Sequence, residues 1–456
     1  MNAIFSPTAT LQAMLDFEAC LARAEAKSGV IPKQAVDPIV AACRAELFDL
    51  AALGTAAVRA GNPAIPLIQQ LTELVARNAP EASRYVHVGA TSQDVIDSAL
   101  MLQARAGLGL LQGELARTCA ALERIVLQHR ETVMVGRTWL QHAVPITFGL
   151  KAAGWLSGLC RDHARLRMLQ PRVSYLQFGG AAGTLGSLGA RGMLVAEALA
   201  QELGLTLPEL PWHTQRDRIT ETGALLGLLI MSYGKLARDI TLLMQNEVGE
   251  VCEPTAADRG GSSSMPQKRN PVGSAVALAA AVRAPGLVST LLTAAVQEHE
   301  RGLGGWHAEW EPLPELFRLA AAASHAMRDV LEGLHVDAPR MLANLERGAG
   351  QPFAEQVALA LAVHLGKPAA HALVQRLSQQ AERAGRHMRA ELGASAEVRA
   401  LLDDAALDAL FDPQRALGAT QAFIDRALAQ AAAERAQVQP VPVAPDDSQE
   451  LQPPGA

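Results

Sequence analysis

The sequence predicts an all-α fold built around a central bundle of long helices. Aromatic residues make up only 4% of the 456 residues, whereas alanine and leucine dominate, and such a composition favours helices over strands. Apolar residues also recur at steps of three and four, which is the spacing of one helix face. Four such segments are Leu108–His129, Thr222–Glu250, Ser274–Gln297 and Leu313–Leu345. Each predicts a helix well beyond the usual ~11–12 residues.

One of these helices is apolar on almost every side. Leucine and isoleucine occupy all faces of Thr222–Glu250, namely Leu225, Leu226, Leu228, Leu229, Ile230, Leu236 and Leu242. A helix without a polar face is buried inside a bundle or at an oligomer interface.

The chain divides into three expected domains and a tail. We expect an N-terminal helical domain at residues 1–105, the central bundle at 106–345 and a smaller helical domain at 346–436. The remaining residues, 437–456, are rich in proline and acidic side chains. Such a segment cannot bury enough apolar surface to fold, so a disordered tail is expected.

Composition also excludes several classes of function. The formal net charge of -6 argues against a nucleic-acid partner, but a few local cations can still bind an anionic small substrate. The five cysteines are odd in number and show no C-x-x-C spacing, which indicates a reducing cytoplasm and neither disulfides nor zinc. We see no signal segment and no uncharged apolar run of ~18 residues, so no membrane span is expected. The histidines are scattered, and we expect no metal site and no cofactor.

Two glycine-rich or polar segments stand out as candidate loops. Residues Phe178–Gly189 are rich in glycine but lack the lysine and preceding strand of a phosphate-binding loop, so a flexible connection between helices is the preferred interpretation. Residues Gly260–Pro271 read GGSSSMPQKRNP and combine two glycines, three hydroxyls and two cations. Pro266 and Pro271 exclude a continuous helix there. This loop either closes over a carboxylate substrate or is a solvated linker.

The string G-S-S-x-M-P-x-K-x-N-P in this loop, residues 258–271, resembles the signature loop of the fumarase/aspartase superfamily. The resemblance implies that Ser262 is the catalytic base, with Ser263 as a second candidate. It also implies that Met265, Lys268 and Asn270 contact the substrate. Further segments resemble the family in chain order, namely Ile4–Pro32, His87–Asp94, Gly136–Pro145 and Gly350–Gln379.

The resemblance implies a homotetramer in which each active site takes residues from three subunits. Members of the family remove a proton α to a carboxylate, and the resulting dianion needs preorganised donors and cations. Thr91 and Ser92 are suitable donors, although both residues also suit a helix N-terminus with Asp94 in the same turn. Ser262 is a poor base in water, and either Lys268 or backbone N–H groups of its turn must favour the alkoxide.

The second shared region, G-R-T-W-L-Q-H-A-V-P, departs from the wider family. Many members have histidine where this chain has Trp139, and indole cannot carry a proton at neutral pH. His142 lies three residues later, one turn on if the segment is helical, and either replaces the missing histidine in catalysis or is structural. Arg137 and Gln141 of this region are expected to bind substrate.

The missing histidine indicates a leaving group that needs no general acid, such as a carboxylate. The cycloisomerase branch of the superfamily is similar here and in Trp306–Trp310. Its reaction interconverts 3-carboxy-cis,cis-muconate, a tricarboxylate, and 4-carboxymuconolactone. The alternatives are a fumarate-releasing lyase, such as adenylosuccinate or argininosuccinate lyase, and a non-catalytic structural protein on the same scaffold.

Further substrate-binding candidates lie outside the loop. His87 precedes the first shared region, and Gln215 and Arg218 belong to a stretch that resembles a substrate-contacting segment of the family. Arg218 suits a bidentate carboxylate contact, or else an Arg–Asp pair at a helix start. His299 and Arg301 follow the predicted helix Ser274–Gln297, and His299 is either a site residue or part of a solvated helix end.

Overall fold

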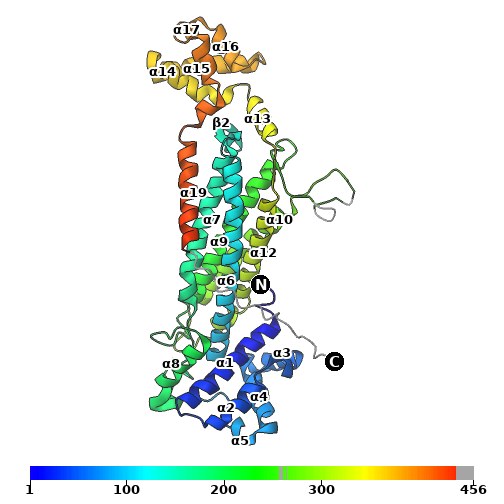
Figure 1. Ribbon diagram of the computed structural model, residues 1–456, viewed down its shortest axis with the longest axis vertical. Coiled ribbons are helices and arrows are strands. Elements are labelled where there is room, and N and C mark those ends of the chain that lie inside the picture. The colour runs from blue at the N-terminus through cyan, green and yellow to red at the C-terminus, as the bar shows by residue number, and fades with distance from the viewer. Residues whose placement is uncertain (256–259, 263, 438–456) are drawn as a thin grey trace, which may run out of the picture.

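The computed structural model describes residues 1–255, 260–262 and 264–437. The fold is elongated: a helical cluster that contains the N-terminus lies at one end, a bundle of long helices fills the middle, and a second helical cluster lies at the far end (Figure 1). The predicted all-α fold is confirmed, and the strands of the described residues form one hairpin and one short antiparallel pair. The predicted tail at 437–456 lies outside the described residues beyond Gln437.

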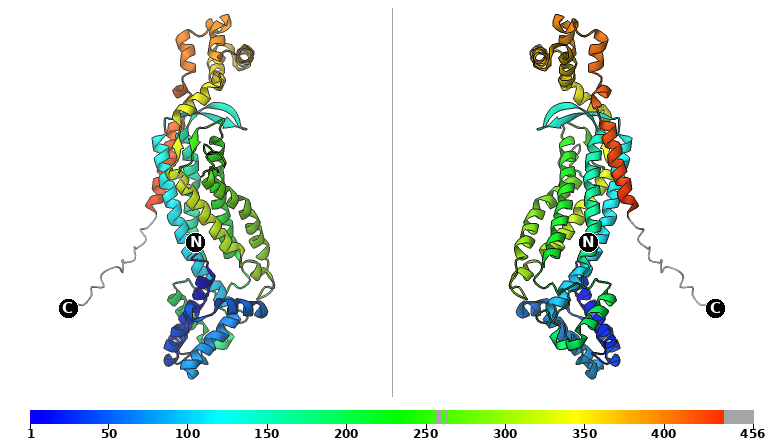
Figure 2. Two further views of the ribbon diagram at one scale, coloured as in Figure 1. Left: turned by 90° about the vertical axis from the view of Figure 1, so that its right-hand side faces the viewer. Right: turned by 90° about the vertical axis from the view of Figure 1, so that its left-hand side faces the viewer.

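The central bundle consists of helices that run along the long axis of the molecule (Figures 1 and 2). Its members are α6 (Ser92–Gln128), α7 (Phe148–Val173), α9 (Asp217–Leu243), α10 (Val272–Ala294) and α12 (Pro312–Glu332), joined by α19 (Thr420–Ala436) and the short α11 (Gly305–Ala308). Their buried side chains form one continuous hydrophobic cluster. The return of α19 to the bundle places the end of the C-terminal segment beside α7.

The two end clusters are built from shorter helices. The N-terminal one contains α1 (Pro7–Lys27), α2 (Val36–Ala42), α3 (Leu50–Ala60), α4 (Ala64–Asn78), α5 (Pro80–Ser83) and also α8 (Gly192–Leu203). The C-terminal one contains α13 (Ala338–Glu346), α14 (Ala354–Leu365), α15 (Lys367–Arg383), α16 (Met388–Ala394), α17 (Ala396–Arg399) and α18 (Asp404–Leu410). We propose three helical units on this basis, with α8 assigned to the first and α19 to the second.

The long helices differ from the predicted segments mainly at their ends. Helix α6 starts at Ser92 because Thr91 caps it together with Asp94, in a reciprocal capping box. The segment Leu313–Leu345 was predicted as one helix, and this was wrong. Helix α12 ends at Glu332, and β4 (His335–Val336) then pairs with β3 (Val251–Cys252) before Asp337 caps α13.

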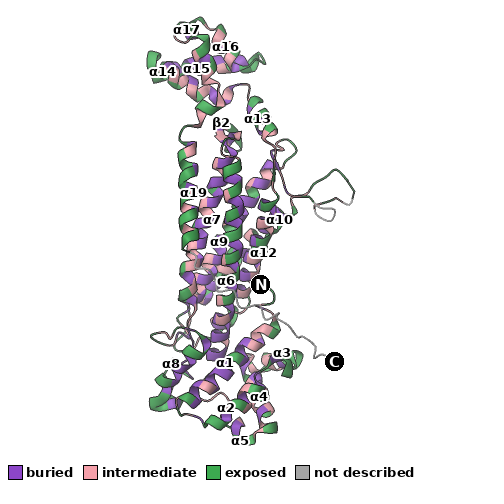
Figure 3. Cartoon of the chain, in the orientation of Figure 1, coloured by how far each residue is buried: buried purple, intermediate pink, exposed green. Residues whose placement is uncertain are grey.

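The apolar helices are only partly covered within one chain. On α9, Leu226, Leu229 and Ile230 are fully buried, whereas Leu228 is 42% exposed. On α10, Val282 is 80% exposed, and exposed residues follow much of this helix and α3 (Figure 3). Helix α10 is also long and apolar enough to cross a membrane by composition alone. Its central Arg283, however, pairs with Glu315 of α12 at 2.7 Å.

Helix α1 carries two fully buried carboxyl groups, Glu18 and Glu25, two turns apart. Neither carboxyl oxygen of Glu25 has a hydrogen-bond partner among the described residues. Burial, together with the charge of Glu18, raises the pKa of Glu25 to about 9. The carboxyl group of Glu25 is therefore neutral in the folded protein at pH 7, whereas in an unfolded chain it ionises above its ordinary value of 4.5.

This difference predicts that Glu25 lowers stability as the pH rises between about 4.5 and 9, since the unfolded chain then binds fewer protons than the folded one. Replacement by the neutral isostere, Glu25→Gln, removes this dependence. The stability gained by Glu25→Gln over wild type is expected to be larger at pH 8 than at pH 5 by at least about 1 kcal/mol. Unfolding by urea at fixed protein concentration measures it, with the exposed Glu73→Gln as control. A gain that does not change with pH contradicts the prediction.

Candidate active site

The segments predicted to carry the chemistry lie in three groups that one chain does not bring together. The first group surrounds the N-terminus of α6, and the second, the hairpin that contains β2, lies at the opposite end of the bundle (Figure 1). Helix α6 has 37 residues, which corresponds to about 55 Å at 1.5 Å per residue. The third group, the loop before α10, starts from the hairpin's end of the bundle, because Arg137 of the hairpin bonds Glu250 beside β3.

In the first group, Asp94 is a buried hub at the start of α6. Its carboxylate accepts hydrogen bonds from the backbone N–H of Thr91 at 3.1 Å and of Gly180 at 2.9 Å, and it contacts His213 Nε2 at 2.8 Å. The glycine-rich stretch thus connects α7 to α8, and its backbone N–H groups at Gly179 and Gly180 donate to Asp94. Thr91 acts as the helix cap, so the alternative role foreseen for it is present in the structure, and Ser92 is the first residue of α6.

His87 lies beside this hub in a strained backbone conformation. Its φ of 59° falls in the left-handed region, which non-glycine residues rarely adopt. Nδ1 of His87 lies 2.7 Å from Oε1 of Glu18, which is 1% exposed on α1. Burial by itself lowers the pKa of His87, but the charge and hydrogen bond of Glu18, aided by the charge of Asp94, outweigh it and raise that pKa above its ordinary value.

Two candidates from the segment after α10 belong to the same group. Arg301 is half-buried and donates from Nη1 to Oγ1 of Thr91 at 3.0 Å. His299 was placed at a helix end by the sequence, which was wrong, because α10 ends at Ala294 and His299 lies in the following loop with a φ of 48°. The side chain of His299 is exposed, and its carbonyl oxygen accepts the hydroxyl of Thr214.

The charged residue that organises this region is Arg216, which the sequence analysis passed over in favour of Arg218. Arg216 is 2% exposed and makes bidentate hydrogen bonds to both Asp97 and Glu309. Arg218 forms no ion pair with an acidic side chain of the described residues, so the Arg–Asp pair at the helix start that was its alternative role is absent. Its guanidinium stacks on Tyr175 at 4.3 Å.

The neighbouring candidate Gln215 is exposed and pairs with Val296 through an isolated backbone bridge. A signal for Arg216 did exist: Asp97 is an acid within the apolar stretch that starts α6, and a buried acid requires a partner.

The second group is a β-hairpin and not a helix, so the helical spacing assumed between Trp139 and His142 was wrong. Strands β1 (Val133–Thr138) and β2 (Gln141–Thr147) are antiparallel, and a two-residue turn joins them. Trp139 and Leu140 form the turn with φ of 52° and 63°, the positive values of a type I′ hairpin. Trp139 is 97% exposed at the tip.

His142 lies opposite Arg137 across the hairpin, while Gln141 lies opposite Thr138. Arg137 donates two hydrogen bonds, of 2.6 and 2.9 Å, to the fully buried Glu250, so its guanidinium ties the hairpin to the end of the α9–β3 connection. Desolvation and the positive charge of Arg137 lower the pKa of His142. His142 is therefore a neutral imidazole at pH 7, able to accept a proton.

The third group is the loop that precedes α10. Oγ of Ser262 accepts hydrogen bonds from the backbone N–H of Ser264 at 3.4 Å and of Met265 at 3.2 Å. The side chain of Lys268 is exposed to solvent, as is that of Met265. Ser263, the second candidate for the base, lies outside the described residues.

The base of this loop is closed by hydrogen bonds. The backbone N–H of Asn270 donates to Gly260 at 2.8 Å, and its side-chain amide donates to Gly261 at 3.2 Å. The buried carboxylate of Glu253 accepts the first amides of α10, from Gly273 and Ser274. The two ends of the loop are therefore held together.

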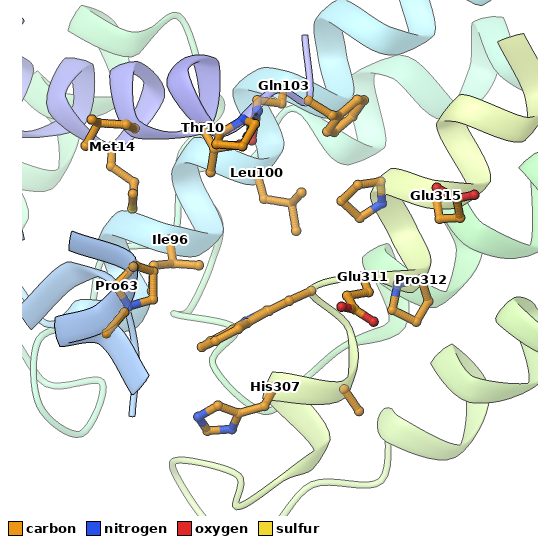
Figure 4. Close-up of a pocket in the computed structure, with 18 of the residues that line it drawn as sticks. Thr10, Met14, Pro63, Ile96, Leu100, Gln103, His307, Glu311, Pro312 and Glu315 are labelled. Carbon is orange, nitrogen blue, oxygen red and sulfur yellow. Dashed lines mark hydrogen bonds between the residues drawn. The ribbon is translucent and has the colours of Figure 1, made fainter. Parts of the chain in front are cut away.

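A large pocket lies apart from these three groups of candidate residues. A pocket of about 1270 Å³, partly open to solvent, lies between α1, α3, α6 and the start of α12, with Met14, Ile96, Leu100 and Pro312 on its walls (Figure 4). None of the candidate site residues in the described ranges lines it. Within those same ranges, no three His, Cys, Asp or Glu side chains group as metal ligands.

Comparison with known proteins identifies the family of the chain. Residues 1–286 match a family model described as lyase, and residues 350–427 match one described as adenylosuccinate lyase C-terminus. The chain is 56% identical over 430 residues to the 3-carboxy-cis,cis-muconate cycloisomerase of Pseudomonas aeruginosa, covering 94% of each chain. It is 52% identical over 428 residues to that of Bradyrhizobium diazoefficiens, covering 94% of this chain and 95% of the other.

A solved structure gives the same result at the level of the fold. The 3-carboxy-cis,cis-muconate lactonizing enzyme from Pseudomonas putida superposes with a TM-score of 0.91 at 50% identity, over 95% of this chain and 97% of that one. The chain therefore belongs to the lyase family of the fumarase/aspartase superfamily, as its signature loop indicates.

Proposed function

We propose that the chain is a cycloisomerase that interconverts 3-carboxy-cis,cis-muconate and 4-carboxymuconolactone. The observation that carries this proposal is the similarity to such cycloisomerases over nearly the whole chain, at up to 56% identity. Trp139 supports it independently, because an indole at the tip of the hairpin cannot protonate a leaving group. A carboxylate leaves as a stable anion at pH 7 and needs no such proton.

The proposed reaction balances with one proton and one C–O bond. In the lactone-opening direction, Ser262 removes the proton from the carbon α to a carboxylate, and the C–O bond on the adjacent carbon breaks to release a carboxylate. In the lactonising direction, a carboxylate oxygen adds to the double bond and the proton is delivered to the neighbouring carbon. His142, neutral at pH 7, is the second proton-handling group of this proposal.

The environment of Ser262 suits a serine that must act as a base. Two backbone N–H groups already point at its Oγ, and donors to the charged form lower the free energy of an alkoxide. Lys268 of the same loop adds a positive charge when the loop closes over substrate. The backbone amides of the turn thus provide hydrogen-bond donors that stabilise the serine alkoxide.

The substrate carries three carboxylates, and we assign their contacts to the remaining candidates. Arg301 and His87 lie at the start of α6 beside the hydroxyls of Thr91 and Ser92, and Lys268 and Asn270 lie on the loop. These cations and donors match a polycarboxylate substrate, in a chain whose formal net charge of -6 disfavours nucleic acid.

We infer a homotetramer whose active sites combine residues of three subunits. The length of α6 separates His87 from the hairpin by about 55 Å within one chain. The exposed apolar side chains of α9 and α10, such as Leu228 and Val282, supply surface for the contact between subunits. All five cysteines are free, and four are buried, which supports a cytoplasmic location.

The direct test is the ultraviolet absorbance of 3-carboxy-cis,cis-muconate with the purified protein. We expect loss of the conjugated-diene band, and NMR should identify the product as a lactone of unchanged mass. Release of fumarate from adenylosuccinate or argininosuccinate, with muconate untouched, contradicts the proposal.

Ser262→Ala is expected to lower kcat by about 10²–10⁴, the usual contribution of a general base. The fold and assembly should remain intact, because the side chain lies on a loop and accepts only two local hydrogen bonds. The matched control is Ser264→Ala, which removes a hydroxyl of the same loop and keeps the backbone N–H that Ser262 uses. Near-normal turnover by Ser262→Ala removes this residue from the mechanism.

Mixing two impaired variants tests whether the sites are shared. Ser262→Ala alters the loop before α10 and His87→Asn alters the segment before α6, so a shared site can pair an intact loop from one subunit with an intact His87 from another. After subunit exchange in an equal mixture, roughly a quarter of the sites should be intact. Sedimentation should show tetramers throughout. A mixture as inactive as its components, despite exchange, indicates sites built within one chain.

A further inference from the structure

Glu18 makes a buried contact that the proposed chemistry has not used. Its carboxyl group is 1% exposed on α1, and Oε1 lies 2.7 Å from Nδ1 of His87, a residue 69 positions away in the chain. Burial of a carboxylate costs free energy unless a charged or hydrogen-bonded partner offsets it. The contact is therefore a specific pairing of a buried acid with an imidazole whose side chain is still 17% exposed.

The backbone at His87 supports a role beyond packing. A φ of 59° is energetically unfavourable for a non-glycine residue, and such strain persists where the surrounding structure holds it in place. Here the strained residue directs its ring at Glu18 while the segment continues into Thr91, the cap of α6. The strained backbone thus holds the imidazole of His87 between α1 and the predicted substrate-binding residues at the start of α6.

We propose that Glu18 is a positioning residue: by binding Nδ1 of His87, it fixes the ring so that Nε2 donates to a carboxylate of the substrate. This inference rests on the proposed function and deepens it. With Nδ1–H engaged by Glu18, Nε2 makes no hydrogen bond to any residue that the structure describes. A carboxylate beside the imidazole favours its doubly protonated form, in which both ring nitrogens are donors.

The neighbourhood of His87 fits an anion at this position. Arg301 donates to Thr91, four residues beyond His87, and Asp94 lies close enough to both His87 and Arg301 to act on their charges. The two cations are therefore each balanced by a buried acid on the protein side. A substrate carboxylate that binds His87 and Arg301 on their solvent-facing side therefore displaces solvent and breaks no contact with another residue.

The test is a double-mutant cycle on the full-length enzyme with 3-carboxy-cis,cis-muconate. Glu18→Gln keeps the shape of the side chain and removes its charge, and should lower kcat/KM by about ten- to a hundredfold, the range expected for the loss of one hydrogen bond to a charged group. The loss should lie mainly in KM, since the carboxylate is bound in substrate and transition state alike. In a His87→Asn background, Glu18→Gln should cause no further loss.

Glu25→Gln is the matched control, because Glu25 is a fully buried carboxyl group on the same helix that does not contact His87. It should leave kcat/KM unchanged. Equal losses from Glu18→Gln in the presence and absence of His87, or a loss in kcat alone with a lowered Tm, show a structural role and overturn the proposal.

A binding measurement separates this inference from the proposed function. Calorimetric titration with propane-1,2,3-tricarboxylate, which cannot form the lactone, should show binding by wild type and weaker binding by Glu18→Gln. If wild type binds this probe without converting the muconate, the proposed reaction fails and the role of Glu18 stands on the binding difference. If wild type and Glu18→Gln bind the probe equally, the role of Glu18 fails, whatever the reaction.

Discussion

The length of helix α6 is the constraint on which the rest of the arrangement depends. Its 37 residues form one rigid element, capped at Thr91, and about 55 Å lie between the first group of candidate residues and the hairpin. No loop of the described chain bridges that distance. A site that uses both ends must therefore be completed by other subunits, and the apolar side chains left exposed on α9 and α10 are the surface that such an assembly needs.

At the start of α6, buried acids hold the candidate substrate-binding groups in place. Asp94 fixes the capped turn and the glycine-rich connection, and Asp97 shares Arg216 with Glu309. Removal of one partner from such a network leaves an uncompensated charge in a region of low dielectric constant, so the network favours a single arrangement. Glu18 extends the same pattern to His87. A site for a polyanionic substrate can thus contain buried acidic residues when these residues hold basic side chains in position.

The sequence predicted the helices well and the contacts between them poorly. The helices α6, α9 and α10 were found from apolar residues at steps of three and four, a spacing that a single sequence records. The hairpin was missed because Trp139 and Leu140 occupy turn positions that glycine or asparagine usually fill. Arg216 and Arg218 cannot be told apart by residue type, since only tertiary structure decides which is buried. The signature loop was found because its residues are contiguous, whereas Glu18 and His87 meet only after folding.

The turn of the β1–β2 hairpin also constrains the proposed mechanism. Two bulky residues with positive φ cost free energy at its tip, and Trp139 is almost fully exposed in one chain. A tip of this kind is suited to pack against another subunit, where an indole excludes water and donates one hydrogen bond but moves no proton. In the proposed mechanism, proton transfer therefore depends on Ser262 and His142 and not on Trp139. A site without a general acid at Trp139 is sufficient for a reaction whose leaving group is a carboxylate. It is insufficient for a reaction that expels an amine or hydroxide.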